Sequence, residues 1–273
     1  MPVLLLLSLL FLFIIGTAVG SFLNVVSRRL LRGEAITGRS RCESCQKTLS
    51  GADLIPLLSF LLLRGRCRYC RARLSWQYPL VEVGTGLLFA ALAWKCNLLT
   101  INYELLTIIP LLIASSSLIV IFTTDLLEQR VFDQVLLVGV IAAFFYRLAI
   151  NYLPTEALAK VGHLSPIISD LLLASAVFAF FWFLRLITKG RGMGEGDPPV
   201  GFLATLLVGY PQGLVMLFLA FILGAVVGLI LIFLKKKKFE DQIPFAPFLA
   251  SAVFVSIFFG ESILSWYLGL LGI

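Results

Sequence analysis

Charged side chains are scarce in this chain of 273 residues: 14% are Asp, Glu, Lys or Arg, while 60% are hydrophobic. A soluble domain of ordinary composition carries about 25% charged residues. Apolar runs of roughly 20 residues recur along the sequence, and each is long enough to cross a bilayer core of about 30 Å. The composition therefore excludes a single soluble core and indicates a protein that crosses the membrane several times.

Three other signatures are also missing from the sequence. It has no series of segments of about ten residues in strict polar–apolar alternation, which argues against an outer-membrane barrel. No basic region precedes the first apolar run and no small-residue cleavage site follows it, so we expect a retained helix rather than a signal peptide. No Gly-rich strand–helix fingerprint of the dinucleotide-binding type is present. An all-α polytopic membrane protein remains.

The apolar runs predict about eight transmembrane helices. The sixth and seventh are separated only by the tight turn Tyr210-Pro211-Gln212-Gly213. The spans are expected at residues 3–26, 78–94, 105–124, 134–151, 166–187, 198–209, 212–234 and 247–270. This division gives a first transmembrane helix in residues 1–26, a loop domain in residues 27–77 and a membrane domain of about seven helices in residues 78–273.

Lysine and arginine are distributed unevenly between the loops. Of the 22 Lys and Arg residues, only Lys95, Arg147 and Lys160 fall on one side of the predicted membrane, and the other 19 fall on the opposite side. Positive charge marks the cytoplasmic side, so we expect both termini outside and residues 27–77 in the cytoplasm. The net charge of +7 then reflects contact with the lipid bilayer and not with nucleic acid.

The predicted cytoplasmic loop contains two C-x-x-C pairs, Cys42 with Cys45 and Cys67 with Cys70. In a reducing compartment this spacing favours a tetrahedral zinc site of the zinc-ribbon type. Four thiolates would leave no open coordination position, so the predicted role is structural. The loop also has too few apolar residues to build a core alone. A redox dithiol and four unligated thiols are the alternatives.

Two aspartates stand where apolar helix meets the predicted cytoplasmic boundary: Asp125 ends the third span and Asp197 precedes the sixth. Ionisable groups at such positions are candidates for function. Two neighbouring carboxyl groups that share one proton can hydrolyse a peptide, one as general base and the other as acid. Gly194 and Gly196 are expected to let an extended substrate approach and to permit unusual φ angles.

A purely structural interpretation of these aspartates is also open. Asp133 can cap the fourth span and Asp197 the sixth, each accepting a backbone N–H that the helix leaves unpaired. Pro198 suits the first turn of a helix. Glu82 is either a buried carboxylate of a functional site or a satisfied residue at a helix entrance.

Taken together, the motifs resemble the type IV prepilin peptidase family, bifunctional leader peptidases and N-methyltransferases of the GxGD class of intramembrane aspartic proteases. The resemblance runs from Gly20 to about Leu249. It is carried by Gly20-Ser21-Phe22-Leu23-Asn24-Val25, Arg41-Cys42-Glu43-Ser44-Cys45, Ile55-Pro56-Leu57-Leu58-Ser59, Leu62-Leu63-Arg64-Gly65-Arg66-Cys67, Tyr78-Pro79-Leu80-Val81-Glu82, Asp125 with Asp133, Gly192-Met193-Gly194-Glu195-Gly196-Asp197 and Ile243-Pro244-Phe245-Ala246-Pro247. The chain departs from the family's usual pattern at Leu54, Phe132 and Pro198-Pro199.

The resemblance implies an eight-span protease of the bacterial inner membrane, with residues 78–273 as its peptidase domain. Asp125 and Asp197 match the family's catalytic aspartates, and the four cysteines match its metal-binding loop. Such enzymes cut the leader from type IV prepilins or type II secretion pseudopilins on the cytoplasmic side. They then methylate the new N-terminus with S-adenosylmethionine. The alternatives are an intramembrane aspartyl protease of another substrate class without methyltransferase activity, and a non-enzymatic transporter with a zinc-ribbon loop.

Overall fold

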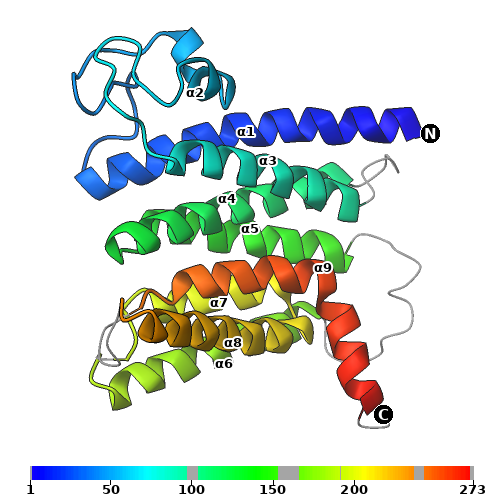
Figure 1. Ribbon diagram of the computed structural model, residues 1–273. Helices are drawn as coiled ribbons and strands as arrows, with labels where there is room; N and C mark the ends of the chain where they lie inside the picture. The colour runs from blue at the N-terminus through cyan, green and yellow to red at the C-terminus, as the bar shows by residue number, and fades with distance from the viewer. Residues whose placement is uncertain (1, 97–103, 153–165, 191, 237–242, 271–273) are drawn as a thin grey trace. The chain divides into compact units, whose positions relative to one another are not determined.

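The computed structural model describes residues 2–96, 104–152, 166–190, 192–236 and 243–270 (Figure 1). Within these ranges the chain is helical apart from short connections and two isolated β-bridges, which confirms the all-α prediction. The helices are α1 (Pro2–Arg32), η1 (Gly51–Leu54), α2 (Leu58–Leu62), α3 (Gln77–Lys95), α4 (Glu104–Glu128), α5 (Asp133–Tyr152), α6 (Pro166–Ile187), α7 (Asp197–Val208), α8 (Gln212–Phe233) and α9 (Ala246–Leu270).

Six of the described helices are long and apolar enough to cross a membrane: α1, α4, α5, α6, α8 and α9. This confirms a multi-pass membrane protein. Helix α7 has only 12 residues, which at 1.5 Å per residue gives about 18 Å, well short of a bilayer core. Helix α3 lies outside the set of six although it has 19 residues. The total of eight spans therefore stays a prediction.

The chain divides into two compact units, Met1–Glu104 and Leu105–Ile273. In the first unit α1 packs closely against α3 with opposite chain direction. A Cβ added at Gly16 would lie 2.8 Å from the Cα of Gly86, and one at Gly20 would lie 2.9 Å from the Cα of Glu82. Small residues allow membrane helices to approach in this way. Gly20, the first landmark of the resemblance, is thus explained by helix packing.

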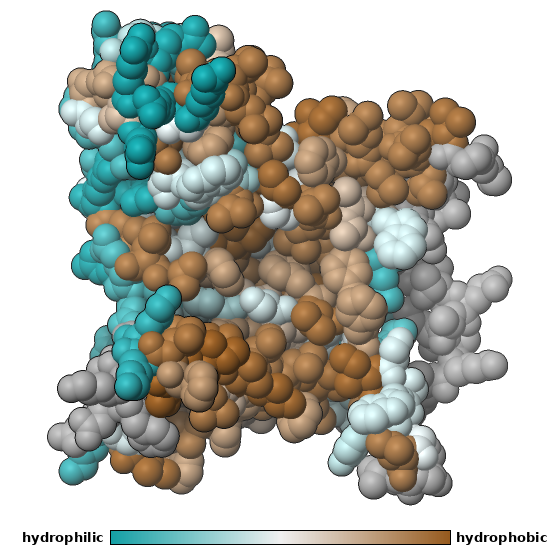
Figure 2. Space-filling view, in the orientation of Figure 1, coloured by the Kyte–Doolittle hydropathy of each residue, from teal (hydrophilic) through white to brown (hydrophobic). Residues whose placement is uncertain are grey.

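The first residues of the predicted loop domain, 27–77, continue the first helix. Helix α1 extends past residue 26 to Arg32. Arg29, in the last turn of α1, donates hydrogen bonds to the carbonyls of Ala35, Gly38 and Arg39 and so holds the start of the loop. Figure 2 shows hydrophilic residues gathered over the loop part of this unit and hydrophobic residues along the N-terminal half of α1.

In the second unit α7 lies at the centre and packs against α5, α6, α8 and α9 (Figure 1). Ten of its twelve residues are buried. Such a helix is apolar on all sides because it faces other helices rather than lipid. Its first residue, Asp197, is therefore carried on the most enclosed element of the unit.

Candidate functional site

Asp125 lies in the last turn of α4, and only 6% of its surface is exposed. The preceding Thr123 and Thr124 are buried too, and their hydroxyls donate to helix carbonyls one turn earlier. Asp125 receives the backbone N–H of Ala246, the first residue of α9. Its Oδ2 atom is buried and has no hydrogen-bond partner within the described ranges.

Asp197 is the first residue of α7 and is 7% exposed. Its Oδ2 accepts the backbone N–H of Gly194 at 2.7 Å. This bond comes from the glycine loop, residues 192–196, which precedes the helix, and the N-cap of α7 is Gly196. The capping interpretation of Asp197 therefore does not describe its hydrogen bond. The helix N-terminus beside the carboxylate favours a negative charge there.

The fold brings the two aspartates together from different helices. The charge of Asp197 acts on Asp125, so the carboxyl groups are close enough to repel each other when both are ionised. Two like charges in an enclosed site favour sharing of one proton. The arrangement can therefore present a general base and an acid side by side.

The two glycines before Asp197 provide space rather than unusual backbone angles. Gly196 has a φ of −79°, and Gly194 is not among the residues with positive φ, so that part of the expectation was wrong. A Cβ added at Gly196 would lie 2.5 Å from Cγ2 and 2.7 Å from Cβ of Val131. One added at Gly194 would lie 3.3 Å from Oδ2 of Asp197. Val131, in the α4–α5 connection, can pack against Gly196 because this residue has no side chain, and the absence of one at Gly194 leaves room for the carboxylate of Asp197.

The other acidic residues close to Asp125 and Asp197 in the sequence are exposed. Glu128 is about half exposed and faces Arg130 at 3.6 Å. The side chain of Glu195 is 86% exposed and pairs with Arg185. Asp133 is an exposed residue in the first turn of α5, which suits its expected role at a helix terminus.

Sequence reasoning missed a buried ion pair at the far end of α7. Arg147 of α5 contacts Oδ2 of Asp170 of α6 through Nε and Nη2, both at 2.7 Å. Oδ1 of Asp170 accepts the backbone N–H of Tyr210 at 2.8 Å, and Arg147 donates to the carbonyl of Val208 at 3.3 Å. The pair thus fixes the C-terminal end of α7. An aspartate inside the apolar run of α6 was the available signal.

The four predicted cysteine ligands converge in the first unit. All four Sγ atoms lie within 4.8 Å of one another, and those of Cys42 and Cys70 are 3.8 Å apart. With Zn–S bonds of about 2.3 Å, the edge of a tetrahedron is about 3.8 Å. The cluster is therefore compatible with one tetrahedral zinc ion.

The two halves of the cysteine cluster repeat the same backbone conformation. The N–H of Cys42 donates to the carbonyl of Lys47, and the N–H of Cys67 donates to that of Ala72. The residue after each second cysteine has positive φ, 56° at Gln46 and 58° at Arg71. Each C-x-x-C segment is therefore a tight turn that directs two thiols to a common point.

Thiol crowding also favours a cation in this cluster. The N–H of Ala72 lowers the pKa of Cys70, but desolvation and the three neighbouring thiols outweigh it and raise the pKa to about 11. A coordinated divalent cation removes this penalty, because it binds thiolates directly.

Glu82 links α3 to the cysteine loop. The residue is 7% exposed, and its Oε2 accepts the backbone N–H of Leu57 at 2.8 Å. Leu57 has a φ of 59°, so this bond supports a strained turn just before α2. The carboxylate is satisfied at a helix entrance, as one of the two interpretations expected, and it also lines a cavity in this unit.

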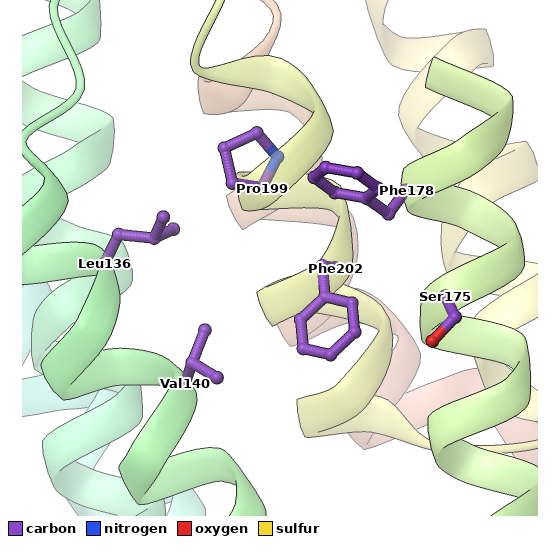
Figure 3. A pocket seen from close by; sticks show the side chains of 6 residues that line it. All are labelled: Leu136, Val140, Ser175, Phe178, Pro199 and Phe202. Atoms are coloured by element: carbon purple, nitrogen blue, oxygen red, sulfur yellow. The ribbon is translucent and has the colours of Figure 1, made fainter. Parts of the chain in front are cut away.

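An apolar recess of about 300 Å³ opens beside α7 in the second unit (Figure 3). Leu136 and Val140 project into it from α5, Phe178 from α6, and Pro199 and Phe202 from α7. The one hydroxyl in its lining belongs to Ser175, and neither aspartate lines it. The lining of the recess therefore contains no carboxyl group and no other acid or base.

Comparison with known proteins gives two adjacent family matches, one within each unit. Residues 14–96 match the Bacterial Peptidase A24 N-terminal domain, and residues 112–229 match the Type IV leader peptidase family. Prepilin leader peptidase/N-methyltransferase of Pseudomonas putida is 31% identical over 95% of this chain and 93% of its own length. The protein of the same name from Bacillus subtilis (strain 168) is 32% identical over 94% of this chain and 96% of its own. No solved structure matches the chain.

Proposed function

We propose that this chain, which belongs to the type IV leader peptidase family, removes the leader peptide from type IV prepilins or pseudopilins and then methylates the new N-terminus. The relatives from Pseudomonas putida and Bacillus subtilis carry both activities in their names. The observation that supports cleavage most strongly is the pair of buried aspartates at the ends of α4 and α7. Ionisable groups are costly to place in an apolar surrounding, so a pair of them there usually marks a functional site.

The environments of the two carboxyl groups suggest their roles in hydrolysis. Asp197, at a helix N-terminus and bonded to the N–H of Gly194, is the ionised member and takes a proton from water. Asp125, with its free Oδ2, holds the shared proton and donates a hydrogen bond to the scissile carbonyl oxygen. Hydroxide adds to the carbonyl carbon. The C–N bond then breaks as Asp197 returns its proton to the leaving amine.

The cysteine cluster supports a structural zinc site. Cys42, Cys45, Cys67 and Cys70 would fill the coordination sphere and leave no position for substrate. Metal binding therefore stabilises the loop and takes no part in the chemistry of cleavage.

Methylation requires a methyl donor, for which we propose S-adenosylmethionine. Such a donor, when bound, would supply a sulfonium methyl group: the lone pair of the pilin amine would form the N–C bond, the S–C electron pair would stay on sulfur, and the new ammonium group would release a proton. The chain itself has to bind the donor and orient the amine.

The charge distribution supports an inner-membrane topology with both termini outside. Of the 22 Lys and Arg residues, 19 lie in loops assigned to the cytoplasm. Residues 1–26 then form the first span, residues 27–77 a cytoplasmic loop domain and residues 78–273 the peptidase domain. On this topology the dyad faces the cytoplasm.

Co-expression with a candidate prepilin, followed by mass measurement of the mature protein, tests the proposal. We expect loss of the leader and the added mass of one methyl group. An uncleaved prepilin, in membranes that contain folded protein, would overturn the assignment. A cleaved but unmethylated product would remove only the second activity. A periplasmic reporter signal at Lys47 would overturn the topology.

A further inference from the structure

The first unit contains a cavity of about 460 Å³ that no part of the cleavage mechanism uses. It lies between the C-terminal half of α1, the cysteine loop and the start of α3, entirely within Met1–Glu104. Its volume falls within the range of small-molecule sites, about 300–1,000 Å³. The lining is mixed: positively charged arginines and negatively charged carboxylates lie beside the rings of Phe60 and Tyr78. A ligand for this cavity must be polar at one end and aromatic or apolar elsewhere.

Two lining side chains on α1 have unused hydrogen-bonding atoms. Asn24 is fully buried and donates to the carbonyl of Tyr78 at 3.2 Å, but its Oδ1 has no partner among the described residues. Arg28 donates to Gln77 through Nη2 at 2.8 Å, and its buried Nε also lacks a hydrogen bond there. The nearest carboxylate oxygen to that Nε, on Glu43, is 4.0 Å away. Buried polar atoms normally have a hydrogen-bond partner, so Oδ1 of Asn24 and Nε of Arg28 are available to bind a ligand.

The spacing of these two atoms indicates the kind of ligand. Asn24 and Arg28 are four residues apart on one helix and therefore share a face. They offer one acceptor and one cationic donor next to each other. An α-amino acid group carries the complementary pair, an ammonium donor and a carboxylate acceptor, on one carbon atom. The rings of Phe60 and Tyr78 also line the cavity, where a purine or a sulfonium cation could contact them. Arg28 lies over the ring of Tyr78, 5.9 Å from its centroid, and Trp76 packs against Phe60, so such contacts would be made beside these neighbours.

We propose that this cavity binds S-adenosylmethionine, with the amino acid end of the donor on Asn24 and Arg28. The proposal rests on the methyl-transfer half of the proposed function. It adds the place of binding, which is separate in sequence from both aspartates. Glu82, through its bond to Leu57, supports the wall of the cavity that Leu54 and Ser59 line.

Binding of S-adenosylhomocysteine, the unreactive product of the donor, tests the site without turnover. The zinc-loaded full-length protein in detergent is compared with Asn24→Ala and Arg28→Lys, the second of which keeps the charge but loses the Nε donor. Loss of a hydrogen bond to a charged partner weakens binding by about tenfold or more, and we expect that change in Kd for each variant. Arg64→Gln, which removes a charge from the same loop outside the cavity, should bind as the unaltered protein does.

The outcomes separate the cavity from the activity. Unaltered Kd values in both variants, together with methylation by the unaltered protein, would overturn the cavity and leave the proposed function standing. Cleavage without methylation or binding would remove the methyl-transfer proposal and the cavity's ligand with it. If a variant loses its zinc and does not fold, photo-crosslinking of labelled S-adenosylmethionine to the unaltered protein decides. Label within residues 21–82 supports the site, and label confined to Leu105–Ile273 refutes it.

Discussion

Breaking the buried pair between Arg147 and Asp170 should destabilise the second unit strongly. The Asp170 side chain is 1% exposed and that of Arg147 12%. In Asp170→Asn the guanidinium stays buried without its counter-ion, and an amide N–H₂ group faces either Arg147 or the N–H of Tyr210. Removing one partner of a buried pair costs about 3–5 kcal/mol. For a chain of this size that corresponds to a fall in Tm of roughly 6–20 °C.

Thermal unfolding in detergent measures this loss, and a second ion pair of the same unit serves as control. Arg185 and Glu195 have side chains 25% and 86% exposed, so Glu195→Gln should cost at most about 1 kcal/mol. The double variant Arg147→Met/Asp170→Leu should lose less than the sum of the single variants, because no buried charge is left unpaired. A Tm unchanged in Asp170→Asn, or strict additivity in the double variant, would refute the role of the pair.

Three further predictions follow from the loops. Gly196→Ala should lower the rate of leader cleavage at least about tenfold, because the new Cβ would overlap Val131. A second change, Val131→Gly, should restore part of the rate. Gly84→Ala should have little effect, because a Cβ at Gly84 would meet no atom within 4 Å. The pKa of Asp53 is lowered mainly by hydrogen bonds from Ser50 and also by the bond from Arg68. The ionised Asp53 therefore stabilises the loop above about pH 4, and this contribution is lost as the pH falls further. Asp53→Asn should make the loop more sensitive to protease at pH 7, and the difference from the unaltered protein should vanish in acid. Removal of zinc by a chelator should expose four alkylatable thiols and a protease-sensitive loop, and metal analysis should find one zinc per chain; four reactive thiols in the untreated protein would contradict this.

The features that the sequence predicted well depend on local pattern. The apolar runs marked every long helix, because a chain that faces lipid must keep its backbone bonded within each segment. The boundary at Asp197 was visible because glycines precede it and prolines follow it. The spacing of the four cysteines was enough to predict their convergence, since each C-x-x-C turn positions two thiols at once.

The features that were missed depend on packing between distant segments. Counting charges placed Arg147 among the outer cations, but its partner Asp170 is 23 residues away on another helix. The need for glycine at 196 comes from Val131, 65 residues earlier, and not from φ. None of these partners can be read from the local sequence.

The rate of leader cleavage by Asp125→Asn and by Asp197→Asn tests the central claim most directly. Asparagine keeps the size of the side chain but cannot exchange the proton, so each variant should lose at least roughly a thousandfold in rate, and the double variant should be little worse than either. Glu128→Gln and Glu195→Gln should keep most of the activity, and Asp133→Asn should cost much less than either dyad variant. Substantial cleavage by a well-folded Asp125→Asn or Asp197→Asn protein would contradict the dyad.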